Sequence, residues 1–518
     1  MHDLDRDGAA GAAAPSVGAV PDPAAGGRAV SPQVLLGIVA LCYAAAQLLL
    51  VTPEFGIEWD EAVYLSQFSL NGEPIFFHAS RGWGTPLIVA PVVMITDSLV
   101  VVRVYLAIVS ALLLFGAFHV WCRVRPGHLA PTAAALFGGC WLSVFYGIEA
   151  LPNVYTALGA VALTGMVLRV AATGTPVTWR SQAAVAAVTF LVSLFRVTDA
   201  TLIALALGGA AALMLRVPER RRRALGAIAA LTGGLAAGWG LWSAEAIIKY
   251  GSFEQRLATA SENFKEPQWL IEHNLRALDG PLSCETVERC GPLPVGGLVW
   301  LAVVLLLMIT GLIAARGYES WIVAATPVIL GAGMAMPYLY FGLRTHPRYM
   351  MPTLGLWAIA AAGGLIFLAA GLRRRSGVAG AAACCSVLIG GHLLLQHSYL
   401  AENVAHHTYV REHDRILTDR IKEIGYGRPC AVFAWNTTIL AHRLGCKAVR
   451  MLSRTVPVVP RSLLAEAEKG YSILVVYREG EDENAHNIAS WPEYQVTKRW
   501  RVRIKEGAGV RAESGLSG

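Results

Sequence analysis

Charged residues are scarce in this chain. Only 15% of its 518 residues are Asp, Glu, Lys or Arg, while 55% are hydrophobic. A soluble globular domain carries about 25% charged residues, so this chain has too few to cover a surface in water. The composition therefore excludes an ordinary soluble domain and predicts a protein with many membrane spans.

Signals for several common activities are missing as well. The nine cysteines have no zinc-site spacing, and the C-terminal part has neither a glycine-rich phosphate loop nor a nucleophile elbow. The net charge of +7 does not indicate nucleic-acid binding, because the basic residues cluster in short loops between apolar segments. Arg220–Arg223 and Arg373–Arg375 are two such clusters, and clusters of this kind are typical of cytoplasmic loops.

The N-terminal segment, residues 1–32, is rich in Ala, Gly, Pro and Asp and has no periodicity. We expect a disordered cytoplasmic tail there. The first apolar run, Val34–Val51, is long enough to cross a membrane and is not followed by a small-residue cleavage site. We therefore expect it to be a retained first span. The abundance of Ala, Gly and Arg favours a bacterial source.

Residues 33–396 are predicted to form an all-α transmembrane bundle, a polytopic fold of about eleven spans. The apolar segments are Val34–Val51, Leu99–Trp121, Pro131–Glu149, Val154–Val170, Ser181–Phe195, Ala200–Leu215, Ala224–Ile248, Val295–Ala315, Trp321–Phe341, Tyr349–Leu372 and Val378–Leu395. Thr85–Ile95 is too short to cross, and we expect a re-entrant or interfacial helix there.

The arginine clusters also predict the orientation. Both clusters face the cytoplasm if the chain crosses an even number of times between them, as the predicted spans do. The N-terminus is then inside, whereas the loops 52–84 and 249–294 and the C-terminal part are outside. Cys284 and Cys290, in the second of these loops, could form a disulfide if the outside is oxidising.

Residues 397–518 are predicted to form a small extracytoplasmic α/β domain, because strand and helix patterns alternate there. The predicted helices are Val410–Ile424, Thr437–Leu444 and Ser462–Lys469, and the predicted strands are Cys430–Ala434, Lys447–Met451, Tyr471–Tyr477, Tyr494–Trp500 and Val502–Lys505. Asn436 is expected to cap a helix.

Asp60 and Glu61 are adjacent carboxylates directly after the first span. Carboxylates near lipid are costly and usually functional. The predicted topology brings further polar residues to the same outer ends of spans, which favours a site there. These residues are Arg103, Glu149, Asn153, Arg196, Asp199, Arg344, His346 and Arg348.

The order of these motifs resembles the GT-C superfamily of membrane glycosyltransferases. The motifs are Trp59-Asp60-Glu61 with Tyr64, the stretch Gly82–Leu87, Arg103, the corners Glu149–Asn153 and Phe195–Asp199, and the run His346–Pro352. The layout is similar to that of protein O-mannosyltransferases and of the aminoarabinose transferase of lipid A. The resemblance covers residues 34–395 and leaves the C-terminal domain out.

The resemblance implies an inverting transfer of a sugar from a polyprenyl phosphate to an acceptor hydroxyl on the outer face. The acceptor could be a lipid, a glycan or a protein. Asp60 would be the general base or would position the acceptor, with Glu61 beside it. A carboxylate within hydrogen-bond reach can take the hydroxyl proton during attack, and partial burial would raise its pKa and make it a better base.

The leaving lipid phosphate needs cationic partners, and arginine matches phosphate oxygens well. The candidates are Arg348, Arg344, Arg196 and Arg103, with Tyr64 and Glu149 as further substrate-binding residues. Several relatives have an aspartate at the corner where this chain offers Glu149 and Asn153. Asp60, Glu61 and Glu149 could also hold a divalent metal ion, and their spacing decides neither for nor against it.

Two other functions stay open. A transporter or flippase of lipid-linked saccharides would show paired inverted repeats and broken helices near mid-membrane, whereas the charged groups here gather at one predicted face. A non-catalytic relative of the transferases would keep the layout without the reaction.

Overall fold

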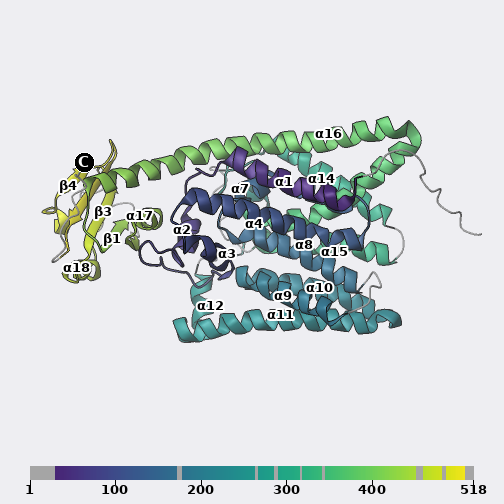
Figure 1. Cartoon of the computed structure of the whole chain (residues 1–518), viewed down its shortest axis with the longest axis horizontal. Coiled ribbons are helices and arrows are strands. Elements are labelled where there is room, and N and C mark those ends of the chain that lie inside the picture. The colour runs from purple at the N-terminus through teal and green to yellow at the C-terminus, as the bar shows by residue number, and fades with distance from the viewer. Residues whose placement is uncertain are drawn as a thin grey trace, which may run out of the picture. The chain divides into compact units, whose positions relative to one another are not determined.

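The computed structural model describes residues 30–171, 178–262, 267–284, 290–315, 318–340, 345–450, 459–480 and 486–507. Most of the predicted N-terminal tail and Arg344 lie outside these ranges. The residues from Pro32 onward belong to one compact unit. It consists of a helical bundle and a C-terminal sheet (Figure 1).

Helices account for almost all of the bundle. In chain order they are α1 (Pro32–Ala46) with η1 (Gln47–Val51), α2 (Trp59–Ser66), α3 (Gly84–Val93), α4 (Leu99–His119), α5 (Trp121–Val124), α6 (Leu129–Gly138), α7 (Trp141–Gly147), α8 (Pro152–Ala171), α9 (Trp179–Phe195), α10 (Val197–Leu213) with η2 (Met214–Arg216), α11 (Pro218–Tyr250), α12 (Phe253–Ser261), α13 (Ile271–Arg276), α14 (Val295–Ala314), α15 (Tyr318–Tyr340), η4 (Pro347–Met350) and α16 (Met351–Ile424).

Many of these helices are long enough and apolar enough to cross a bilayer. Within the described residues, eight satisfy both conditions, or nine if α6 and α7 together make one span. Helix α9 is apolar but falls just short in length. The protein is therefore a multi-pass membrane protein, as its composition predicts.

The predicted span Pro131–Glu149 is wrong as a single helix. Helices α6 and α7 meet there at an angle of 75°, with Cys140 in an extended conformation between them. Gly139 allows this break to pack closely, since a Cβ on it would lie 2.6 Å from the Leu393 side chain of α16. The Ala135 carbonyl would lie 2.8 Å from the same Cβ, so the break leaves little room for a side chain at this position.

Helix α16 joins three segments that the sequence predicts separately. The predicted spans Tyr349–Leu372, apart from its first two residues in η4, and Val378–Leu395 lie in it, divided by a break at Gly377, whose φ is 75°. Beyond residue 395 neither glycine nor proline interrupts the chain before Gly425, so the helix continues. It carries the chain from the bundle into the sheet (Figure 1).

The C-terminal region is a mixed sheet with the order β2-β1-β3-β5-β4. Its strands and helices are β1 (Cys430–Ala434), α17 (Thr437–Leu444), β2 (Lys447–Arg450), α18 (Arg461–Glu468), β3 (Ser472–Arg478), η5 (His486–Ile488), β4 (Glu493–Gln495) and β5 (Trp500–Lys505). Strands β2, β1 and β3 are parallel, and β5 and β4 are antiparallel. The predicted α/β region is confirmed.

The residues of this sheet explain its layout. The strands β1 and β3 are apolar along nearly their whole length and are buried, as expected for central strands covered on both faces. Strand β4 is shorter than the predicted Tyr494–Trp500, because a turn closed by a hydrogen bond from the Val496 N–H to the Trp500 carbonyl follows it, and β5 begins at Trp500, before the predicted Val502. A disulfide that the sequence did not indicate joins Cys430 to Cys446.

The sheet region contacts the loop after α2. Helix α17 packs against α2, and the Tyr471 hydroxyl donates a 2.5 Å hydrogen bond to Glu73. At Gly72, with φ of 85°, a Cβ would lie 2.7 Å from the backbone of Gly445. These contacts fix the short helix from which the candidate site is built.

Candidate active site

The first turn of α2 is held by a reciprocal cap. The Glu58 carboxylate accepts hydrogen bonds from the backbone N–H groups of Asp60 and Glu61, at 2.6 and 3.4 Å. In return, the Glu58 N–H donates to Glu61 at 3.0 Å. Capping of this kind satisfies N–H groups that a helix start leaves free. Glu58, Asp60 and Glu61 thereby acquire fixed and different orientations.

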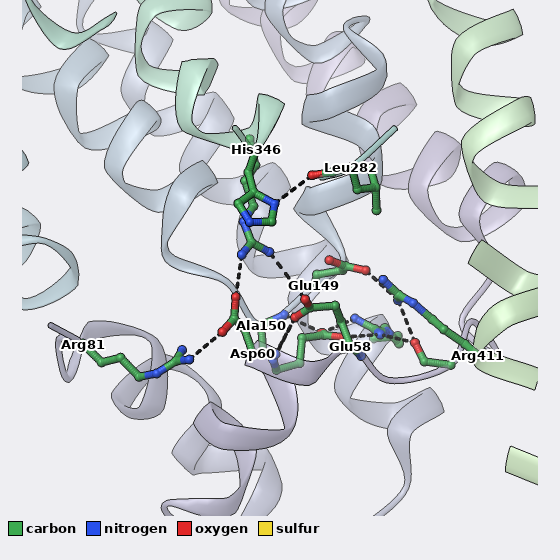
Figure 2. A network of polar contacts seen from close by, with 12 residues as sticks. Glu58, Asp60, Arg81, Glu149, Ala150, Leu282, His346 and Arg411 are labelled. Atoms are coloured by element: carbon green, nitrogen blue, oxygen red, sulfur yellow. Dashed lines mark hydrogen bonds and ion pairs between the residues drawn. The ribbon is translucent and has the colours of Figure 1, made fainter. Parts of the chain in front are cut away.

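Asp60 lies between two arginines that are far from it in the sequence. Arg81 Nη2 is 2.5 Å from its Oδ1, and Arg348 Nη2 is 2.5 Å from its Oδ2. Figure 2 shows the Arg81 side chain pointing at Asp60. Burial alone would raise the pKa of Asp60, but the two guanidinium groups more than offset it and hold that pKa well below its usual range. Asp60 is therefore ionised at neutral pH.

Aromatic rings connect Arg348 to a third arginine. The Arg348 guanidinium lies 5.9 Å from the Tyr146 ring and 5.7 Å from the Tyr349 ring. Arg196 lies 4.9 Å from the same Tyr349 ring and forms an ion pair with Asp199 at 3.4 Å. Contacts between cations and rings orient guanidinium groups without neutralising them. Arg196 and Arg348 thus form a cationic region beside Asp60.

Both carboxylate oxygens of Glu61 have hydrogen-bond partners. It forms a two-point ion pair with Arg103, in which Nη2 lies 2.7 Å from Oε2, and it accepts the Ala150 N–H at 2.8 Å. Arg103 also donates to the carbonyls of Ile148 and Gly56, at 2.8 and 3.0 Å. Both charged side chains are fully buried. Such an arrangement stabilises the junction of α2, α4 and the corner before α8.

Glu149 is also fully buried, and its partner comes from α16. Arg411 Nη1 lies 2.7 Å from Glu149 Oε1 and donates to the Gly56 carbonyl at 2.8 Å. Figure 2 shows Glu149 facing Arg411. Burial raises the pKa of Glu149, and Arg411 works against this shift. A Cβ at Gly56 would lie 2.6 Å from the Arg411 Cβ, so glycine allows α16 to approach the α2 loop.

The structure brings most of the predicted residues together. Tyr64 is buried, and the Arg81 guanidinium lies 5.0 Å from the Tyr64 ring. Arg344 falls outside the described residues. The carboxylates predicted for a metal ion each face a guanidinium, and the described part of the chain offers no group of three or more such ligands. Glu58, Arg81 and Arg411 were not predicted as site residues.

A second network holds the loop that carries Arg81. Glu245, near the end of α11, accepts a hydrogen bond from the Trp83 indole at 2.7 Å and pairs with Lys249 and Arg256, both at 2.9 Å. Arg256 also donates to the Ala79 carbonyl at 3.3 Å. These contacts join α11 and α12 to both sides of Arg81 and thereby support its position at Asp60.

Solved structures share this architecture, although no family model and no curated protein sequence matches the chain. ArnT from Cupriavidus metallidurans bound to undecaprenyl phosphate matches with a TM-score of 0.62 at 13% identity, over 91% of this chain and 97% of that chain. The apo state of the same protein matches with a TM-score of 0.61 at 14% identity, over 94% of this chain and 98% of that chain. The oligosaccharyltransferase AglB from Archaeoglobus fulgidus, in complex with an inhibitory peptide and a dolichol-phosphate, is also similar. It matches with a TM-score of 0.51 at 12% identity, over 86% of this chain and 69% of that chain.

The chain has the GT-C fold. The resemblance drawn from the motifs is thus confirmed for the architecture. The match to ArnT covers 91% of the chain. Residues 1–395 alone make up a smaller share of the 518 residues. The GT-C similarity therefore extends into the C-terminal region, which the motifs did not cover.

Proposed function

We propose that this protein is a GT-C glycosyltransferase that moves one sugar from a polyprenyl phosphate to an acceptor hydroxyl. The observation that carries the proposal is the position of Asp60, a partly exposed carboxylate held between Arg81 and the buried Arg348. The similar ArnT structure contains undecaprenyl phosphate, and the similar AglB structure contains dolichol-phosphate. A lipid phosphate is therefore the donor class that we infer.

The arginines supply what the leaving group needs. When the bond between the anomeric carbon and the phosphate oxygen breaks, negative charge develops on the lipid phosphate. Arg348 and Arg81 would stabilise that charge, with Arg196 as a third cation close by. Guanidinium groups already in position provide such stabilisation without reorganisation during the reaction.

The acceptor hydroxyl needs a carboxylate that can take its proton as it attacks the anomeric carbon from the side opposite the phosphate. Such a single displacement inverts the anomeric configuration. A lipid, a glycan or a protein could provide the hydroxyl.

We infer that the site faces the outside. Arg220–Arg223 lie at the start of α11, whereas Glu245, in the network that holds Arg81, lies near its end. Likewise, Arg373–Arg375 lie beside the break in α16, whereas Arg348 directly precedes that helix. Arg220–Arg223 are thus at the end of α11 opposite the site, and Arg373–Arg375 are at the far end of the first segment of α16. Both positions favour the predicted orientation.

The test is single-turnover sugar transfer in nanodiscs with a panel of polyprenyl-phosphate sugars and an extract of membrane lipids and glycans. Wild type is compared with Asp60→Asn and with Asp97→Asn, a matched change at an exposed loop aspartate. We expect transfer by wild type and Asp97→Asn and its loss in Asp60→Asn. Equal transfer by all three would remove Asp60 from the reaction, and no transfer with any donor would contradict the proposal.

A further inference from the structure

Four carboxylates gather around the start of α2, and they differ in how far they are open to a substrate. The side chains of Glu58 and Asp60 are 26% and 20% exposed, whereas Glu61 and Glu149 are fully buried. A proton acceptor must come within hydrogen-bond reach of the hydroxyl that it deprotonates. Glu58 and Asp60 are therefore the candidates within this cluster.

Their bonding separates these two candidates. Each oxygen of Asp60 already accepts a hydrogen bond from a guanidinium nitrogen 2.5 Å away, so two arginines compensate the charge of this carboxylate and it attracts a further proton less strongly. Glu58 uses Oε2 for the cap of α2, and its Oε1 is 3.7 Å from Arg348 Nη1. This distance is longer than a hydrogen bond. Oε1 is thus the carboxylate oxygen that an incoming hydroxyl can approach most directly.

We propose that Glu58, and not Asp60, takes the proton from the acceptor hydroxyl. The inference rests on the proposed transferase function. In this step the acceptor O–H proton moves to Glu58 Oε1, and the acceptor oxygen bonds to the anomeric carbon. The bond from that carbon to the phosphate oxygen breaks, and the lipid phosphate leaves with the bonding pair. Asp60 has a positioning role, since it orients Arg81 and Arg348 toward the leaving phosphate.

The geometry of Arg348 supports this division. Its Nη2 contacts Asp60, while Nη1 faces Glu58. A phosphate bound at the same guanidinium would therefore lie close to Glu58. The cap of α2 holds the Glu58 carboxylate in place through two backbone N–H groups, so the base would be oriented before a substrate arrives. Orientation before binding is a main source of catalytic rate.

The surroundings of Glu58 suit a base that works near neutral pH. Burial raises the pKa of Glu58 to about 7, and the negative charges of Asp60 and Glu149 act in the same direction. Arg348 from η4 and Arg411 from α16 work against the shift. A general base is most effective when its pKa is close to the operating pH. The lowered pKa of Asp60 makes that residue a weaker base by comparison.

The test is the pH dependence of the single-turnover rate in the full-length protein from about pH 5 to 9. Wild type is compared with Glu58→Gln, Glu58→Asp and Glu54→Gln, the last a matched change at an exposed carboxylate of the same loop. We expect the wild-type rate to rise about tenfold per pH unit below about pH 7 and then level off, as for a base that must be ionised. Glu54→Gln should behave like wild type.

Glu58→Gln keeps a side-chain oxygen for the cap of α2 but cannot accept a proton. We expect its rate to fall about 100-fold or more, with loss of the acidic limb and with unchanged binding of polyprenyl phosphate. Glu58→Asp should keep the acidic limb at a reduced rate. A Glu58→Gln variant that retains the rate or the limb would overturn the inference, and so would a loss of lipid-phosphate binding that accounts for the whole effect. No transfer by wild type would instead refute the function itself.

Discussion

The carboxylates around α2 form two pairs that differ in their environment. The open pair, Glu58 and Asp60, is partly exposed and faces Arg348. The closed pair, Glu61 and Glu149, is fully buried, and each member has its own arginine, Arg103 or Arg411. All four residues lie close together, yet only the open pair offers a substrate a surface to bind.

One cluster of carboxylates can therefore serve both structure and chemistry. Buried charges are tolerated when good partners compensate the loss of water. Glu61 meets that condition through Arg103 of α4 and the Ala150 N–H, whereas Glu149 has only the ion pair with Arg411 of α16, and neither of its oxygens accepts a hydrogen bond from the described residues. Carboxylates with shifted pKa values in an accessible position are candidates for catalysis. The closed pair would then fix the backbone on which the open pair is presented.

Removing Arg348 should have the largest effect on activity. Arg348→Ala takes away the guanidinium shared by Asp60 and Glu58, and we expect single-turnover transfer to fall about 1000-fold, a loss typical of a missing transition-state donor. Arg348→Lys should retain part of the rate, because it keeps the charge without the planar fork. The control is Arg415→Ala at a half-exposed arginine of α16. A rate within about threefold of wild type would show that the open pair does not act through Arg348.

Removing Arg103 should instead affect stability. Arg103→Met leaves Glu61 buried without its counterion, and we expect a loss of about 3–5 kcal/mol in the free energy of unfolding. Thermal unfolding in detergent measures this change. The double variant Arg103→Met with Glu61→Gln should recover part of the loss, since no unpaired charge remains. A single variant that melts like wild type would contradict the structural role of the closed pair.

Removing Arg411 should make stability depend more strongly on pH. Without this cation the already raised pKa of Glu149 rises further, so the folded protein keeps a proton that the unfolded chain has released. Stability is then favoured at low pH and is lost as the pH rises. We expect the melting temperature of Arg411→Met to fall more steeply than that of wild type between about pH 5 and 8. Parallel curves would argue against the pairing of Arg411 with Glu149.

The ring shared by two arginines should have the smallest effect. Tyr349→Leu removes the contact with Arg196 and Arg348, and contacts of this kind contribute about 0.5–2 kcal/mol. We expect polyprenyl phosphate to bind about threefold to thirtyfold more weakly. Tyr409→Leu, at a tyrosine that is 81% exposed, is the matched control. Unchanged binding by Tyr349→Leu would exclude the ring from the phosphate site.

Local patterns predicted much of the fold. The bounds of β1 and α17 agree with the predictions because an apolar strand and a short helix that ends at a glycine are encoded over a few neighbouring residues. The predicted cap at Asn436 is wrong, since its side chain makes no capping hydrogen bond and donates to Asp414 instead. The break at Cys140 was missed, since it depends on how closely Gly139 approaches α16. The continuous course of α16 was missed as well, because the switch from apolar to polar composition after residue 395 looks like a domain boundary.

The site was predictable in part for a similar reason. Asp60 and Arg348 were both indicated by their positions at span ends, but their contact joins residues 288 positions apart. Pairing over such distances depends on helix rotation and packing, which one sequence does not reveal. Arg411 belongs to a region read as a separate domain, and Arg81 resembles an ordinary loop arginine. Glu58 carries a local signal, since Glu58 and Glu61 have the spacing of a reciprocal cap.

The most direct test of the central claim compares the four carboxylates within one experiment. The single-turnover transfer rate and the melting temperature are measured for Glu58→Gln, Asp60→Asn, Glu61→Gln and Glu149→Gln. We expect the two variants of the open pair to lose transfer and keep a melting temperature close to that of wild type. The two variants of the closed pair should lose thermal stability first. The division would be contradicted if all four variants lost transfer and stability to the same degree, or if the open pair tolerated both changes.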